Sequence, residues 1–132
     1  MGFFFEDDTR NNLIRCTWQG KVSDDTLFEV HSAGGKLLAA RRACKVIDDF
    51  SGVTQIDISS EAVRRLANLP SAVPQGSVHV IVAPQDLMFG LSRMYSILGE
   101  ASHPNLHVVR TVKEAYELLG VTSPEFSRVS AA

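Results

Sequence analysis

Hydrophobic residues along the chain follow two spacings, one typical of strands and one typical of helices. Short runs rich in aromatic or β-branched residues predict strands at 3–5, 13–18, 44–48, 78–83 and 106–109, and residues 56–58 add a brief extended piece. Apolar residues spaced three and four apart predict helices over 23–41, 59–69, 84–99 and 111–120. Strands that alternate with helices favour right-handed crossovers and parallel pairing.

Polar and glycine residues between these runs predict how the elements are joined. Residues 8–12 have a turn sequence, so the first two strands should form an antiparallel hairpin, with Gly20 ending the second strand. Another turn is expected over 50–53, and Gly34-Gly35 predicts a kinked helix or two short helices. We therefore expect an α/β fold with one mixed, mostly parallel sheet of about five strands and about four helices. The helices could all lie on one face of the sheet.

The chain length suits a single domain, which we place at 1–120 of the 132 residues. The segment 121–132 is rich in serine and contains Pro124, which predicts a mobile tail or a short docking segment. The aromatic first strand, Phe3-Phe4-Phe5, could pair edge to edge with a second copy and form a homodimer.

Charge, hydrophobicity and cysteine content indicate which partners and which cellular compartment to expect. Thirteen basic and fifteen acidic residues give a net charge of −2, which provides no basic footprint for nucleic acid. No apolar run is long enough to span a membrane, and the start of the chain lacks the pattern of a signal peptide. Cys16 and Cys44 lie in apolar, strand-like runs, which favours buried reduced thiols over a disulfide. These features indicate a cytoplasmic protein.

One segment in the middle of the chain is similar to a known family. The run Val46-Ile47-Asp48-Asp49-Phe50-Ser51-Gly52-Val53-Thr54-Gln55-Ile56-Asp57 resembles the central signature of STAS domains, the anti-anti-sigma-factor fold. Residues 83–98 and 109–115 resemble a bacterial branch described as SpoIIAA-like or STAS/lipid-transfer-like. The resemblance covers about residues 13–120. It implies a STAS-like fold and a non-enzymatic regulatory or protein-interaction module of the bacterial cytoplasm.

This sequence differs from the STAS family at the position that is phosphorylated in sigma-regulating members. Sigma-regulating members carry a phosphorylatable Ser directly after the Asp of an Asp-Ser-Ser-Gly step, whereas Ile58 follows Asp57 here. Ser59 matches the second Ser of that step. Ser59 or Ser60 could accept phosphate instead, although each also suffices as an ordinary helix N-cap.

Three acidic residues are candidates for binding. Asp48, Asp49 and Asp57 should cluster around one strand end, and ligands of α/β sheets bind outside the carboxyl ends of strands. Paired carboxylates could hold a divalent cation or act as acid and base, but they also occur in solvated turns. No His or Lys close in sequence completes a catalytic set, so we expect no enzymatic activity.

The four histidines do not form a recognisable metal site. His103 and His107 are separated by Pro104 and Asn105 and have no third ligand at a metal-binding spacing. His79 lies in the apolar run 78–83 and is expected to be a hydrogen-bonded residue of the core or of the sheet edge. We therefore expect neither a metal nor a cofactor.

Arg93 lies between apolar positions on the helix predicted over 84–99. It should pair with an internal acid, Asp48 or Asp49, or with the acidic head group of a ligand. In the second case Phe89, Met88 and Tyr95 would wall a pocket under this helix. The alternative function is therefore a carrier of a small amphiphilic ligand or lipid, a role that the lipid-transfer branch of the resemblance also implies.

Overall fold

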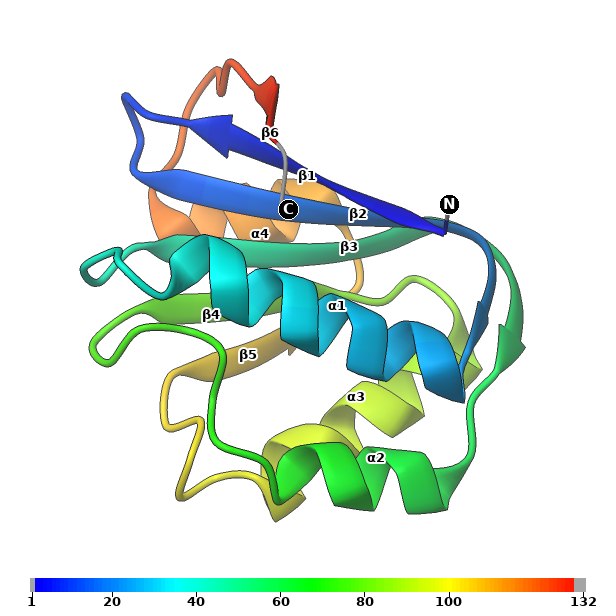
Figure 1. Cartoon of the computed structure of the whole chain (residues 1–132). Helices are drawn as coiled ribbons and strands as arrows, with labels where there is room; N and C mark the ends of the chain where they lie inside the picture. Colours follow the sequence, from blue (N-terminus) through cyan, green and yellow to red (C-terminus); the bar gives the residue numbers. More distant parts are fainter. Residues whose placement is uncertain (1, 130–132) are drawn as a thin grey trace.

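The structure is a computed structural model that describes residues 2–129 (Figure 1). The order of elements along the chain is β1 (Phe3–Asp8), β2 (Leu13–Ser23), α1 (Asp24–Leu38), β3 (Lys45–Asp57), α2 (Ser60–Ala67), β4 (Val78–Val82), α3 (Asp86–Leu98), β5 (Leu106–Val109), α4 (Val112–Leu119) and β6 (Ser127–Val129). This order confirms the predicted α/β fold with an N-terminal hairpin and four helices.

The strands form one sheet in the order β5-β4-β3-β2-β1-β6. The three pairings among β2, β3, β4 and β5 are parallel, whereas β1 pairs antiparallel with both β2 and β6. The sheet is therefore mixed and mostly parallel, as predicted, and it has six strands because the C-terminal segment adds one.

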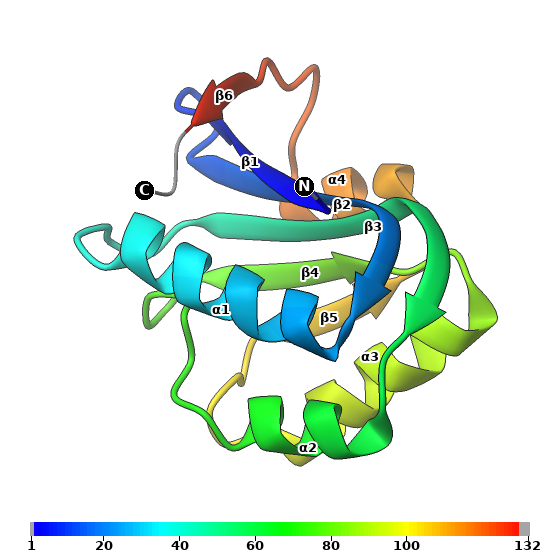
Figure 2. The same cartoon turned by 45° about the vertical axis from the view of Figure 1, so that its right-hand side comes forward.

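Helices cover both faces of the sheet. Helices α1, α2 and α3 lie on one face, and α4 lies on the other (Figure 2). The expectation that all helices share one face is therefore wrong. The central strands are apolar on both sides, as is typical of parallel strands, so the second face needs a cover of its own. On that face Ala115 and Leu119 of α4 pack against Leu13, Ile47 and Val80.

Strands β2 and β3 are longer than their hydrophobic runs predict. Gly20 does not end β2 but continues it with φ of +67°, and the expected turn over 50–53 belongs to β3. The register of the β2–β3 pair shifts between Thr17 and Gln19 and again between Gly20 and Lys21. Such bulges bend strands, and Figure 2 shows both strands turning towards the starts of α1 and α2.

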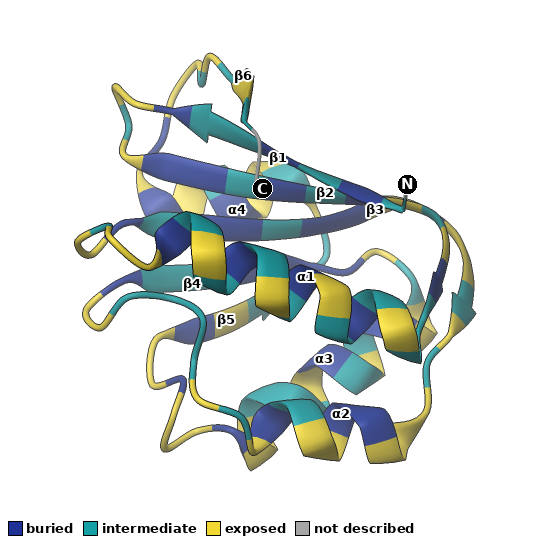
Figure 3. Ribbon diagram, viewed as in Figure 1, coloured by how far each residue is buried: buried dark blue, intermediate teal, exposed yellow. Residues whose placement is uncertain are grey.

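Helix α1 is a single helix despite its two glycines. Gly34 is buried, and a Cβ built on it would lie 3.8 Å from the ring of Phe5. Gly34 therefore lets α1 pack closely against β1, and the predicted kink is absent. Figure 3 shows the buried side of α1 turned to the sheet and the exposed side turned to solvent.

The segment expected to be a tail joins the domain through residue 129. Val121 is buried in the core under α4, and β6 pairs with β1 with Val129 opposite Phe5. The carboxylate of Asp8 accepts the backbone N–H of Glu125 at 3.0 Å. Strand β6 pairs with residues 5–7 of β1, so this part of the edge is already occupied, whereas Phe3 and Phe4 lie outside the pairing and the homodimer stays a prediction. Residues 130–132 of the expected tail lie outside the described residues.

The structure also shows the state of the two cysteines and the lengths of the helices. Cys16 and Cys44 are both buried and free, as predicted. No helix within residues 2–129 is long and apolar enough to cross a membrane.

Candidate functional site

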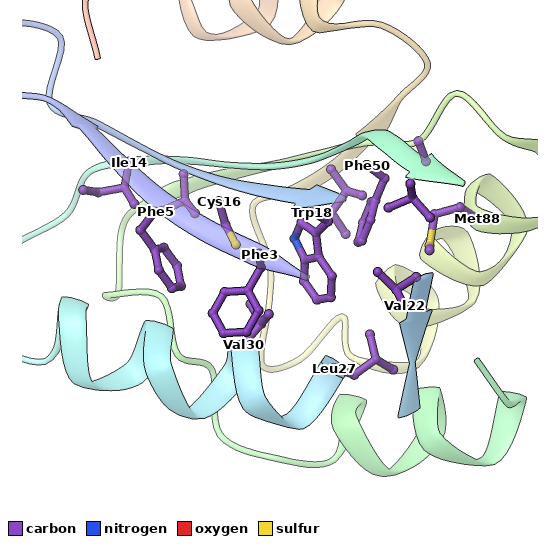
Figure 4. Packing of buried hydrophobic residues seen from close by; sticks show 14 of the residues in the cluster. Phe3, Phe5, Ile14, Cys16, Trp18, Val22, Leu27, Val30, Phe50 and Met88 are labelled. Carbon is purple, nitrogen blue, oxygen red and sulfur yellow. The ribbon is translucent and has the colours of Figure 1, made fainter. Parts of the chain in front are cut away.

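A cavity of about 120 Å³ lies between the sheet and the three helices α1, α2 and α3. Its walls are mainly apolar side chains, and residues 71–73 contribute to one side. Phe5, Trp18 and Phe50 project from the sheet towards α1 (Figure 4), and Met88 and Leu91 of α3 also line the cavity. Side chains two residues apart on a strand share a face, so Trp18 follows Cys16 and Phe50 follows Asp48 along the cavity side.

A polar cluster on the sheet interrupts this apolar lining. The carboxylate of Asp48 on β3 accepts a hydrogen bond from the indole Nε1 of Trp18 on β2 at 2.9 Å. The other oxygen of Asp48 lies 2.6 Å from Nε2 of His79 on β4. The side chains of His79 and Asp48 are only 13% and 16% exposed. Three neighbouring strands therefore bring one acid, one imidazole and one indole together inside the core.

Burial and the negative charge of Asp48 keep the Cys16 thiol and the Tyr95 hydroxyl protonated. Burial, with a smaller contribution from Asp48, raises the pKa of the Cys16 thiol far above its usual range. The pKa of the Tyr95 hydroxyl is raised by the same two causes. A thiol and a phenol in this state donate hydrogen bonds but make poor nucleophiles.

A second polar pair lines the cavity from the helical side. The hydroxyl of Tyr95 on α3 lies 3.0 Å from Nε2 of His103, and the two rings lie 5.0 Å apart between centroids with a tilt of 43°. Burial lowers the pKa of His103, and the charges of His79 and His31 lower it further. The pKa of His31 on α1 is also lowered by burial.

Three of the four histidines thus line one cavity, although they come from α1, β4 and the loop after α3. Sequence reasoning placed His79 correctly as a hydrogen-bonded residue but did not connect it with His31 or His103. Their separation along the chain gives no local signal for such a cluster. Among residues 2–129, no group of three His, Cys, Asp or Glu side chains is arranged to hold a metal ion.

The three candidate acids do not cluster. Asp48 faces the cavity, whereas Asp49 is buried on the other side of the same strand, where it accepts the backbone N–H of Ser51 at 2.9 Å. Asp57 is exposed and lies 4.0 Å from Lys21. Because β3 continues to Asp57, Asp48 and Asp49 do not end their strand, although Asp49 is level with Val82, the last residue of β4.

Of the four residues predicted to form the pocket on α3, Met88 and Tyr95 line the cavity, whereas Phe89 and Arg93 do not. Phe89 lies at the edge of the core, with the Arg110 guanidinium 4.0 Å above its ring. Arg93 is exposed, and it pairs with no carboxylate in the described part of the chain, so the pairing with Asp48 or Asp49 is wrong. A helix turns by about 100° per residue, so Tyr95 and Ser92 face the cavity while Arg93 faces solvent.

Ser59 is the N-cap of α2. Its hydroxyl accepts the backbone N–H of Ala62 at 3.1 Å and donates to the Asp24 carboxylate at 2.8 Å. Ser60 is the first residue of α2 and is exposed. The cap role of Ser59 is therefore confirmed, and phosphorylation of either serine stays a prediction.

Comparison with known proteins adds no further constraint. No protein-family model matches the chain, and no curated protein is significantly similar to it.

Proposed function

We propose that the protein is a non-enzymatic domain that binds a small, largely apolar molecule in the cavity between the sheet and helices α1 to α3. The observation that carries this proposal is the combination of apolar walls with a few converging polar groups, the usual composition of small-molecule sites. Burial keeps Cys16 and Tyr95 protonated, which supports a binding role over a catalytic one.

The size of the cavity limits the ligand. An apolar cavity of about 150 Å³ in another protein accommodates benzene. The cavity here is about 120 Å³, so it suits a molecule of roughly six to eight heavy atoms. A small aromatic molecule therefore fits the cavity better than a lipid, the larger of the two ligand classes considered from the sequence.

Binding can be followed through Trp18, which lines the cavity and is the one tryptophan of the chain. Titration with toluene should change Trp18 fluorescence in a saturable way and raise the melting temperature. Leu66→Phe, which adds volume to a residue lining the cavity, should weaken toluene binding. Leu118→Phe makes the same change at an exposed position of α4 and should leave binding intact.

The outcome depends on both variants remaining folded, which circular dichroism and cooperative unfolding establish. A titration without saturation would contradict the proposal. Equal toluene affinity in folded Leu66→Phe and in the wild type would also contradict it, because the binding site would then lie elsewhere.

A protein-interaction module, as STAS-like membership would imply, is the second candidate. One observation favours it: Leu87, Ile97 and Leu98 of α3 are exposed by 57%, 65% and 49%. Leu87 lies at the start of α3, and Ile97 and Leu98 lie at its end. Exposed apolar side chains of this size are typical of contact surfaces, and we propose a second copy of the chain as their partner. Sedimentation velocity should then show a dimer that Ile97→Lys with Leu98→Lys converts to monomer. A monomeric wild type at high concentration would exclude this surface as a dimer contact.

A further inference from the structure

The hydrogen-bond pattern around His79 points to the chemical class of the ligand. Resting on the proposed function, we infer that the cavity binds a small neutral aromatic molecule with one hydroxyl group, of the phenol class. Its O–H donates a hydrogen bond to Nδ1 of His79, and its ring lies among the apolar side chains of the cavity.

The protonation pattern of His79 follows from its partner. A carboxylate accepts hydrogen bonds and cannot donate them, so Nε2 of His79 carries the hydrogen that it shares with Asp48 at 2.6 Å. The second oxygen of Asp48 accepts from Trp18, which holds the carboxylate in place. In the neutral ring Nδ1 is then left with a lone pair that can accept a hydrogen bond.

This lone pair has no partner in the protein. Nδ1 of His79 is buried and makes no hydrogen bond within residues 2–129. A buried acceptor without a donor is unfavourable, whereas a donor brought by a ligand would satisfy it. His79 lines the cavity, but Nδ1 itself has almost no accessible surface, so a ligand hydroxyl reaches it through a small movement of the imidazole or of a neighbouring side chain.

The charge of Asp48 determines which donor suits the site. Its carboxylate lies in the same cavity wall, so it disfavours a second negative charge and with it an aromatic carboxylate. A neutral hydroxyl provides the hydrogen without adding charge. An amine that is protonated at neutral pH would have to give up its hydration in a mostly apolar space.

The aromatic character of the ligand follows from the walls. The rings of Trp18 and Phe50 lie 4.6 Å apart between centroids, and Phe5 and Tyr95 also line the cavity. Aromatic rings pack well against one another in edge-on and offset arrangements. Phenol has the benzene ring that suits a cavity of about 120 Å³ and adds a single oxygen.

A surface cleft lies next to the histidine side of the cavity. This cleft of about 400 Å³ lies between residues 71–77 and 101–106. His79 and His103 line both this cleft and the cavity. The wall that carries these two histidines therefore separates the cavity from the surface cleft.

The test compares four small aromatic molecules by isothermal titration calorimetry at pH 8. Phenol should bind the wild type at least as tightly as toluene, which has the same number of heavy atoms. Phenol should bind roughly 3- to 10-fold more tightly than anisole, which lacks the O–H, and more tightly than benzoate.

His79→Gln tests the acceptor itself. The glutamine amide nitrogen can replace Nε2 and keep the contact with Asp48, but nothing replaces Nδ1. This variant should lose about 10-fold or more in phenol affinity while its toluene affinity stays within twofold. His107→Gln, at an exposed position of β5, is the matched control and should bind both ligands like the wild type.

The outcomes separate this inference from the proposed function. Toluene binding without preference for phenol over anisole would overturn the inference and leave the proposed function standing. Tighter binding of benzoate than of phenol would also overturn the inference, because it would show an anion site. If none of the four molecules binds, both are overturned. The comparison of phenol with anisole uses only the wild type, so it decides the inference even if His79→Gln fails to fold.

Discussion

Asp48 and His79 lie 2.6 Å apart between carboxylate oxygen and Nε2, although they are not opposite each other in the sheet. His79 is aligned with Val46 and Asp48 with Ile81, so the two residues are diagonal neighbours on adjacent parallel strands. An offset of two residues keeps both side chains on the same face. That face is the one covered by α1, α2 and α3, and the cavity lies there.

Asp48→Asn should destabilise the protein by about 1.5–3 kcal/mol. The substitution replaces one carboxylate oxygen of Asp48 by an amide NH₂ group. This group cannot accept the hydrogen bond from Trp18 or His79 that the oxygen accepted. Urea unfolding followed by circular dichroism measures the change. Asp57→Asn removes an exposed carboxylate and should change stability by less than about 0.5 kcal/mol. Equal effects of the two variants would show that the Asp48 cluster does not contribute to stability.

Two glycines near the cavity should respond in opposite ways to alanine. A Cβ on Gly99 would lie 2.7 Å from Cδ2 of His103, so Gly99→Ala should displace this ring and destabilise the fold by about 1–3 kcal/mol. Gly90 lies inside α3 with open space around it, and Gly90→Ala should stabilise by about 0.5–1 kcal/mol. Thermal and urea unfolding test the pair. A Gly99→Ala variant as stable as the wild type would mean that His103 is free to move.

Ser59→Ala should cost about 1 kcal/mol of stability, because Ala62 N–H at the start of α2 loses its acceptor. The variant also loses the contact with Asp24. Ser60→Ala changes the next, exposed residue and serves as the control, with an expected effect below about 0.5 kcal/mol. Chemical denaturation of both variants decides between a cap at Ser59 and an unimportant surface serine.

Stability should decline as the pH falls below about 6.5. The pKa of His103 is lowered in the folded protein from an ordinary value of 6.5, first by burial and then by the charges of His79 and His31. The unfolded chain therefore binds a proton at a higher pH than the folded protein does. Acidification from about pH 6.5 through the lower folded-state pKa then favours unfolding. Urea unfolding between pH 7.5 and 5.5 should show a smaller decline in His103→Gln, and an unchanged decline would assign the effect to other groups.

Removal of residues 127–132 should expose the outer edge of β1. The truncation removes the pairing of β6 with β1 and the contact of Arg128 with the ring of Phe4 at 3.8 Å. We expect a loss of roughly 1–3 kcal/mol in stability and self-association through the freed edge. Light scattering coupled to size-exclusion chromatography measures the association. A truncated chain that stays monomeric and equally stable would show that β6 does not protect β1.

Local patterns along the chain determined the elements and their order. The helix ends are good examples, since the hydroxyl residues Ser59 and Thr111 act as N-caps and Gly120 adopts φ of +67° after α4. Caps and helical periodicity depend on residues within about four positions of each other, so they can be read without the tertiary structure. The predicted pocket beneath the helix over 84–99 also corresponds to a real cavity, and Tyr95 lines it.

The tertiary structure decided which residues meet. Three features depend on contacts between segments far apart in the chain: the pairing of β6, the packing of α4 on the second face of the sheet, and the length of β3. The same holds for the site: Asp48 was a candidate from the sequence, but its partner His79 is 31 residues away. A strand side chain changes face when the register shifts by one residue, so only the register of β3 with β2 and β4 directs Asp48 to the cavity face and Asp49 to the opposite, also buried, face.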